Sequence, residues 1–237
     1  FTKIFVQNKE SQQLLSSITI ASEVSFDTRF DRVNQIAQNA KSFPAIEKFK
    51  GQSKIIVAGS TWKKDEQIII PLINSGVLTG YNYIIAPHNL NDTAIEELQK
   101  NIKSVSARFS QLTTENAAET HVIIVDTMGD LASIYRYADI AYVGGAFNAG
   151  VHNVLEPAVY GLPVIFGPNY LKSAEAKELR QISAAFPVSD AEQLKAITTG
   201  LNSNTTLTKT AQTNANQYVQ TRLGGVNDIY KYVVTYL

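Results

Sequence analysis

Asn153 and Glu156 are the two residues whose types and spacing best suit ligand binding. They follow the glycine-rich segment Gly144–His152, which comes after the short apolar run Ile140–Val143. Side chains three residues apart lie on one face of a helix, and a carboxylate there can accept hydrogen bonds from both hydroxyls of a diol such as a ribose. A glutamate near a helix start is also often only a capping or dipole partner. The spacing alone leaves both interpretations open.

The surrounding segments predict the element that positions this pair. The run Ile140–Val143 predicts a buried strand, residues 151–160 a helix that ends before Gly161, and residues 163–166 the next strand. Strand, glycine loop, helix and strand make one βαβ unit of a parallel sheet. Pro157 falls in or just after the first helical turn, where its missing N–H costs little. Ligands of such sheets bind at the carboxyl ends of the strands, and a helix amino terminus there favours an anion.

Three other apolar runs, 54–58, 83–86 and 122–125, also end in short polar loops. In a parallel sheet these loops converge with the glycine loop on one crevice. Small polar groups, one glutamate and few charges suit a nucleotide better than a metal ion or a polyanion. The candidate ligand contacts of this crevice are Ser60, Thr61, Pro87, His88, Thr127, Met128, Gly129, Gly144, Gly145, Asn153 and Glu156.

Several of these residues also have a purely structural interpretation. Ser60 and Thr61 could contact a phosphate or could only cap the helix that begins near Lys63. A single histidine at a strand end, such as His88, is more typical of a loop hydrogen bond than of a catalyst. Met128 could pack against a base or fill the core.

The whole chain alternates six to seven predicted strands with helices. This pattern predicts an α/β fold, a Rossmann-like doubly wound parallel sheet, in one domain over residues 1–237. The other expected elements are a strand over 3–6, a helix to about Ser17 capped by Asn8 or Ser11, a strand over 19–21, a helix to about Ala40 capped by Asp27 or Thr28, an edge strand over 106–109, a polar loop over 111–120 and a Thr/Asn-rich linker over 202–210.

Three further features have alternative interpretations. Arg29 and Arg32 could bind an anion, although pairing with the nearby Asp27 and Asp31 is favoured. Pro71 is expected to kink or divide the helix that runs towards Leu78. The last residues, 226–237, follow helical spacing with one apolar face. Packing of that face on this domain is favoured over contact with a missing half.

Composition excludes several classes of function. Lys and Arg number 21, as do Asp and Glu, so no net basic field attracts nucleic acid or anionic lipid. The chain has no cysteine and only three histidines, which excludes disulfides and thiolate sites and disfavours a histidine-built metal site. The longest apolar stretches are far shorter than a membrane span. Because the chain begins at Phe1 without a methionine, we expect it to be a piece of a longer protein.

Four motifs in register carry a family resemblance. They are Asp27–Asp31 (DTRFD), Ala58–Thr61 (AGST), Asp126–Gly129 (DTMG), and the segment that runs from Val143-Gly144-Gly145 through His152–Pro157 (HNVLEP) to Gly167-Pro168. The chain resembles the carboxyl-terminal half of a 3-deoxy-D-manno-octulosonic acid (Kdo) transferase, a glycosyltransferase of the GT-B fold. The last motif is the most specific of the four, and together they span most of the chain.

The resemblance implies a CMP-Kdo donor, with Asn153 and Glu156 on the nucleotide and Glu156 on the ribose. Pro87, His88 and the loop Thr127–Gly129 would border the CMP. It also implies a lipid A precursor as acceptor, lipopolysaccharide biosynthesis as the process and the cytoplasmic face of the inner membrane as the location of the full enzyme. The family's acceptor domain and catalytic carboxylate lie in the amino-terminal half. We therefore expect this piece to be soluble, to bind donor without a metal or other cofactor, to hold no catalytic residue and to be inactive alone.

The sequence departs from the family pattern at three places. Ala86-Pro87-His88 stands where Pro-Arg-His is common, so the arginine for the donor phosphate is displaced or absent. Trp62 stands where a histidine usually follows the Ser-Thr pair. The glycine loop reads Ala149-Gly150-Val151-His152 instead of Gly-Gly-His.

Two other functions remain open. One is a UDP-sugar-dependent GT-B glycosyltransferase or a sugar-nucleotide epimerase of similar architecture. The other is a non-catalytic interaction domain that docks a partner through its apolar carboxyl-terminal helix. A dehydrogenase is disfavoured because no Gly-x-Gly-x-x-Gly follows the first strand.

Overall fold

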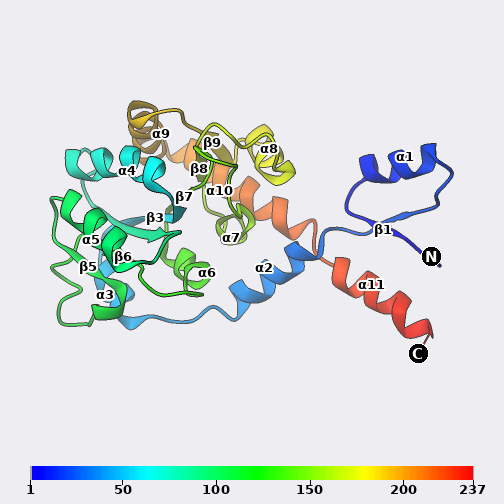
Figure 1. The fold of residues 1–237 in the computed structure, drawn as a ribbon, viewed down its shortest axis with the longest axis horizontal. Helices are drawn as coiled ribbons and strands as arrows, with labels where there is room; N and C mark the ends of the chain where they lie inside the picture. Colours follow the sequence, from blue (N-terminus) through cyan, green and yellow to red (C-terminus); the bar gives the residue numbers. More distant parts are fainter. Residues whose placement is uncertain (1, 237) are drawn as a thin grey trace.

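Seven parallel strands form the main sheet of the computed structural model, which describes residues 2–236 (Figure 1). The strand order is β5-β6-β4-β3-β7-β8-β9, so the order reverses between β3 and β7 in the manner of a doubly wound sheet. This confirms the expected fold class. The strands are β3 (Lys54–Thr61), β4 (Tyr81–Pro87), β5 (Ser106–Arg108), β6 (Val122–Ile124), β7 (Ile140–Val143), β8 (Val164–Phe166) and β9 (Ala185–Pro187).

The strands are apolar on both sides because helices cover both faces of the sheet. Alternate residues of β3 illustrate this: Ile56 packs with α4, α5 and α9, whereas Ile55 packs with α3 and α6 on the opposite face. A third cluster joins α2, α7, α8 and α10 to β7 and β8. The helices of this body are α2 (Thr28–Gln38), α3 (Pro44–Lys50), α4 (Lys63–Ser75), α5 (Asp92–Asn101), α6 (Leu131–Ile134), α7 (Leu155–Ala158), α8 (Ala174–Gln181), α9 (Ala191–Ser203) and α10 (Thr205–Gln220).

Two parts of the chain project away from this body (Figure 1). At the amino-terminal end, β1 (Phe5–Val6), α1 (Lys9–Ser17) and β2 (Glu23–Val24) form a small unit in which β1 and β2 pair in parallel. At the other end, α11 (Gly225–Val233) lies beside this unit, and Tyr232 packs edge-on against Phe5. Asp31 of α2 fixes the start of α11 by accepting hydrogen bonds from the backbone N–H groups of Gly224 and Val226.

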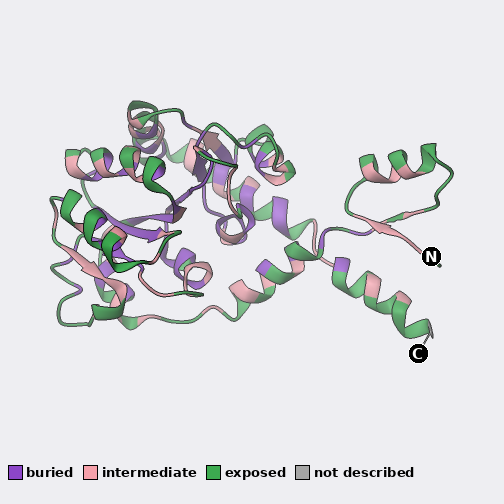
Figure 2. Ribbon diagram, in the orientation of Figure 1, coloured by how far each residue is buried: buried purple, intermediate pink, exposed green. Residues whose placement is uncertain are grey.

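The expectation that the apolar face of the carboxyl-terminal helix packs on this domain is wrong for most of that face, although the helix contacts α2. Gly225 is the one buried residue of α11 among those described, and Val226, Tyr230 and Val233 are exposed by about half or more (Figure 2). Asp31 holds the first turn of the helix at α2, and the rest of the helix extends away from the sheet (Figure 1). Leu237, the expected end of this helix, lies outside the described residues. None of the described helices is both long and apolar enough to cross a membrane.

Two other expectations for single elements are wrong. Residues 19–21 do not form a strand: the chain turns at residues 18–19, where Thr19 has a positive φ, and the strand lies at Glu23–Val24 instead. Residues 202–210 are not a linker, because Asn204 caps α10 and that helix buries Ala211 and Ala215. Of the two expected effects of Pro71, a kink or a division, the division does not occur, because α4 runs unbroken to Ser75. Helix α3, with Pro44 at its first turn, was not expected at all.

Candidate functional site

The loops after β3, β4 and β7 are joined directly at the carboxyl edge of the sheet. Gly144 donates its N–H to the carbonyl of Gly59 at 2.9 Å, and His88 donates its N–H to the carbonyl of Thr61 at 2.8 Å. The structure therefore brings three of the four predicted loops, and the candidates Ser60, Thr61, Pro87, His88, Gly144 and Gly145, into one crevice.

Ser60 and Gly144 make the closest backbone approach in this crevice. Ser60 has φ of +53°, uncommon for a residue other than glycine, and the pairing of β3 with β4 shifts register around it. A Cβ on Gly144 would lie 2.3 Å from the Ser60 carbonyl oxygen, so residue 144 must lack a side chain. Strained backbone of this kind is often found at functional sites.

Gly144→Ala is expected to destabilise the protein by about 1–3 kcal/mol, because backbone atoms of Ser60 would have to move to admit the methyl group. Chemical denaturation measures this effect. Gly200→Ala in α9 is the matched control, since nothing lies within 4 Å of its added Cβ. A helix-interior glycine replaced by alanine gains about 0.5–1 kcal/mol. Equal effects of the two substitutions would contradict the close packing inferred at Gly144.

Asp65 links the loop after β3 to β7 and to the glycine loop that follows it. Its carboxylate is fully buried and accepts hydrogen bonds from the Trp62 N–H at 2.9 Å, the Gly145 N–H at 3.0 Å and the Tyr142 hydroxyl at 2.7 Å. These donors belong to the start of α4, the glycine loop and β7. Burial, and next the charge of Asp65, raise the pKa of Tyr142 above its ordinary value. The residue is placed to hold the floor of the crevice and does not face a ligand.

Three aromatic rings form the wall of the crevice above Asp65. The indole N–H of Trp62 donates to Nε2 of His152 at 2.9 Å, and the two rings are nearly coplanar, with an angle of 7° between them. The imidazole of His88 stacks on both, at centroid distances of 4.3 Å to Trp62 and 5.0 Å to His152. Gly145 lets His152 sit this close, because a Cβ there would lie 2.6 Å from Cδ2 of the ring.

Asn153 and Glu156 are brought together, although the helix that carries them is shorter than expected. Helix α7 spans only Leu155–Ala158, so the loop after β7 continues to Val154 and the predicted helix start at residue 151 is wrong. Pro157 is the third residue of this short helix. Because proline has no backbone N–H, it could not donate the hydrogen bond that a helix beginning at residue 151 would need at this position. Asn153 accepts the N–H of Leu155 at 3.1 Å and donates from Nδ2 to Oε1 of Glu156 at 3.0 Å.

The Glu156 carboxylate retains one free oxygen. Its Oε2 accepts no hydrogen bond from any residue between 2 and 236 that the structure describes. Burial raises the pKa of Glu156, and the hydrogen bond from Asn153 opposes that shift only in part. A half-buried carboxylate with an unpartnered oxygen can accept ligand hydroxyls, and a neutral diol suits it better than an anion.

Two cavities flank the aromatic rings. One, of about 520 Å³, lies between α4 and α5 and is lined by Thr61, Trp62 and Pro87. The other, of about 690 Å³, is lined by His152, Asn153 and neighbouring residues. In the first cavity the buried Thr61 hydroxyl donates to Glu66 at 3.1 Å, so its proton is already engaged within the protein.

The remaining predicted loop, Thr127–Gly129, lies at the same sheet edge but is not hydrogen-bonded to the others in the described part of the chain. Thr127 donates its hydroxyl to Asp130, and the Met128 side chain is 87% exposed, so Met128 does not fill the core. Leu131, at the start of α6, packs against Gly59, which places this loop next to the end of β3.

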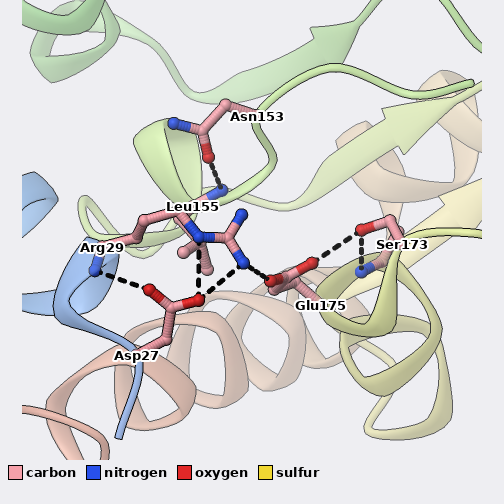
Figure 3. A network of polar contacts seen from close by, with 7 residues as sticks. Asp27, Arg29, Asn153, Leu155, Ser173 and Glu175 are labelled. Atoms are coloured by element: carbon pink, nitrogen blue, oxygen red, sulfur yellow. Dashed lines mark hydrogen bonds and ion pairs between the residues drawn. The ribbon is translucent and has the colours of Figure 1, made fainter. Parts of the chain in front are cut away.

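Arg29 borders the second cavity and is paired with two carboxylates through Nε and Nη2 of its guanidinium (Figure 3). Its side chain pairs with Asp27, as expected, and also with Glu175, which Ser173 orients by donating its hydroxyl at 2.9 Å. Burial alone would raise the pKa of Asp27, but the hydrogen bonds from Arg29 outweigh burial and hold it below its ordinary value. Arg29 is therefore a structural tie between α2 and α8, while Asp31 caps α11 and does not pair with Arg32.

Sequence reasoning missed two contacts near this site, those of the buried Asp65 and the ion pair of Arg29 with Glu175. Asp65 stands three residues after Trp62, which is not a typical cap, so no capping pattern marked it. Glu175 lies 146 residues from its partner Arg29. Within the described part of the chain, no three His, Asp or Glu side chains gather as metal ligands would.

Comparison with known proteins identifies what the chain is similar to. No family model matches the sequence. A 3-deoxy-D-manno-octulosonic acid transferase of Rickettsia prowazekii (strain Madrid E) is 26% identical over 242 residues, which cover 99% of this chain and 52% of that protein. The chain thus spans about half the length of the curated relatives that it matches.

Two solved structures support the α/β fold of this chain. The C-terminal CMP-Kdo binding domain of WaaA from Acinetobacter baumannii superposes with a TM-score of 0.66 at 23% identity, over 81% of this chain and 97% of that one. A UDP-N-acetylglucosamine 2-epimerase superposes with a TM-score of 0.63 at 14% identity, over 96% of this chain and 57% of that one. The resemblance to the carboxyl-terminal half of Kdo transferases predicted from the four motifs is confirmed.

Proposed function

We propose that this chain is the donor-binding half of a Kdo transferase and that it binds CMP-Kdo through the nucleotide. The observation that carries the proposal is the pair Asn153–Glu156, which presents a half-buried carboxylate with a free oxygen beside the glycine loop. A ribose diol can donate two hydrogen bonds to such a group. The similarity of nearly the whole chain to half of the Rickettsia transferase supports the same conclusion.

The nucleotide would lie across the carboxyl edge of the sheet. Glu156 would accept from the ribose, and His88 and the exposed Met128 would border the base from two neighbouring loops. Backbone N–H groups of the glycine loop, with no arginine at position 87 or 88, would contact the phosphate. We propose that this contact needs no metal, because hydrogen-bond donors alone can stabilise the charge that grows on a departing phosphate.

The complete reaction requires a part of the protein that this chain does not hold. We propose an amino-terminal acceptor domain, in the same protein, that binds lipid A precursor at the cytoplasmic face of the inner membrane and supplies the catalytic base. Residues 1–237 would act as one donor domain, and the exposed apolar residues of α11 would face that acceptor domain. The isolated chain would bind donor and transfer nothing.

Calorimetric titration of the chain with CMP, with UMP and UDP as controls, tests the proposal. We expect saturable binding of CMP that is at least tenfold tighter than binding of UMP, because the two bases differ in the groups they offer for hydrogen bonding. Tighter binding of UDP would favour the second candidate, a UDP-sugar enzyme, to which the fold of the epimerase also points. Absence of binding to all three nucleotides would favour an interaction domain.

A further inference from the structure

The hydrogen bond between Trp62 and His152 fixes where the proton of His152 lies. An indole N–H can only donate, so Nε2 of His152, which is 2.9 Å away, must offer its lone pair. The proton of the neutral imidazole is then on Nδ1. Protonation of Nε2 would place two N–H groups against each other and break the bond, so the contact also opposes the charged form of the ring.

Nδ1 is the ring atom on the side away from Gly145. The Cδ2–Nε2 bond of His152 lies against Gly145, at 2.6 and 2.9 Å from the position of an added Cβ, and Nδ1 is the atom opposite that bond. No described residue accepts a hydrogen bond from Nδ1. His152 lines the 690 Å³ cavity together with Asn153, so this N–H is a donor without a protein partner at the site proposed for the nucleotide.

We propose that Trp62 is a positioning residue that holds His152 in the neutral Nδ1–H form, so that His152 donates a hydrogen bond to an oxygen of the bound nucleotide. The nucleotide as the ligand rests on the proposed function, whereas the tautomer of His152 follows from its hydrogen bond with Trp62 alone. Without the indole N–H, His152 could take the Nε2–H tautomer. Its Nδ1 would then present a lone pair to the nucleotide oxygen, and the two lone pairs would repel each other.

The groups around the ring support the neutral state. Burial, and next the neighbouring His88, lower the pKa of His152, while the charge of Asp65 opposes that shift. On the cavity side the charged neighbours are Arg29, Lys172 and Glu175, and Arg29 is held by Asp27 and Glu175. Deletion of the indole N–H should therefore move the pKa of His152 up, towards the ordinary value.

Nitrogen-15 NMR of the ligand-free chain measures the tautomer and the pKa directly. The chain has only three histidines, so His88→Gln and His121→Gln variants assign the spectrum. We expect the Nδ1–H form at His152 in the wild type. In Trp62→Phe, which keeps an aromatic ring but removes the donor, we expect a mixture of tautomers and a higher pKa. His121 lies near Asn82, away from the crevice, and serves as the internal reference.

The effect on the ligand is read by CMP titration of the same proteins. We expect Trp62→Phe to weaken CMP binding about five- to tenfold, as the loss of one hydrogen bond would. His152→Asn, whose amide N–H can replace Nδ1–H, should retain more affinity than His152→Gln, whose amide reaches the Nε2 position.

Three results would overturn the inference: an Nε2–H or doubly protonated His152 in the wild type at pH 7, an unchanged tautomer and pKa in Trp62→Phe, or a changed tautomer without a change in CMP affinity. A wild type that shows the Nδ1–H form but binds no nucleotide would refute the proposed function and the ligand contact, while supporting the control of His152 by Trp62.

Discussion

Asp65→Ala is expected to lower the free energy of unfolding by at least about 3 kcal/mol, the largest effect of any single substitution at this site. The carboxylate accepts hydrogen bonds from Trp62, Gly145 and Tyr142, and all three donors would remain without an acceptor. Each buried donor left unsatisfied costs about 1–3 kcal/mol. Urea denaturation followed by circular dichroism measures the change.

Two further variants separate the loss of the Asp65 hydrogen bonds from the general effect of replacing an aspartate by alanine. Asp65→Asn keeps one acceptor oxygen and should cost less than Asp65→Ala. Asp92→Ala is the matched control, because the Asp92 side chain is 81% exposed and its ion pair with Arg108 should contribute less than about 1 kcal/mol. If Asp65→Ala and Asp92→Ala destabilised the protein equally, the role of Asp65 as the tie between the start of α4, β7 and the glycine loop would be refuted.

Loss of Asp65 should also weaken ligand binding indirectly. The Asp65 carboxylate holds Gly145, which packs against His152, and it also holds the backbone of Trp62 at the start of α4. The positions of the Trp62 and His152 rings therefore depend on a residue that faces no ligand. A buried carboxylate that orients backbone at a site is a common form of support for ligand-binding groups.

The sheet could be predicted from the sequence because its strands are covered on both faces. Runs such as Ile55–Ala58 and Val122–Ile124 are uniformly apolar, and that pattern marks a buried parallel strand without knowledge of its neighbours. The loops at the carboxyl edge follow from the strand positions. This is why the sequence predicts that these loops, and Asn153 with Glu156, lie close together, while their contact with a ligand stays a prediction.

The elements that were missed depend on contacts remote in sequence. Helix α10 begins at Thr205 in a run of Thr and Asn residues with weak helix propensity, and its stability comes from burying Ala211, Ala215 and Tyr218 against other elements. The partners of Asp65 in β7 and the glycine loop lie 77 and 80 residues away. Local sequence patterns predict the apolar face of a helix and its capping residues, but they do not predict which donors remote in sequence bind one carboxylate.

Glu156→Ala is expected to weaken CMP binding by about 1.5–3 kcal/mol, or roughly 10- to 150-fold, because a charged acceptor of ribose hydroxyls would be lost. Glu178→Ala on α8 is the matched control, since its carboxylate pairs with Arg222 at 3.1 Å and lies outside the crevice. Calorimetric titration of the two variants compares them directly. Equal CMP affinities of Glu156→Ala and the wild type would remove Glu156 from the nucleotide site.

Glu156→Gln adds a test through pH and stability. Burial raises the pKa of Glu156, so in the folded protein its ionisation is unfavourable, and the stability lost in this way grows as the pH rises above the ordinary value of 4.5. At pH 7 the glutamine variant should therefore melt at a higher temperature than the wild type, and the difference should vanish below about pH 4. Its CMP affinity should be lower, because an amide has one acceptor oxygen where the carboxylate has two.

The wild type should lose more CMP affinity than Glu156→Gln as the pH falls through the raised pKa of Glu156, because only the wild type has a carboxylate to protonate at this position. The phosphate of CMP titrates near pH 6 in both experiments, so the ratio of the two affinities is the quantity to follow. A ratio that stays constant over pH 4.5–7 would show that the ionised carboxylate does not contact the nucleotide. We expect the CMP affinity of the wild type to approach that of Glu156→Gln as the pH falls. Together with the higher melting temperature of the variant, this result would mean that Glu156 serves ligand binding and lowers the stability of the protein.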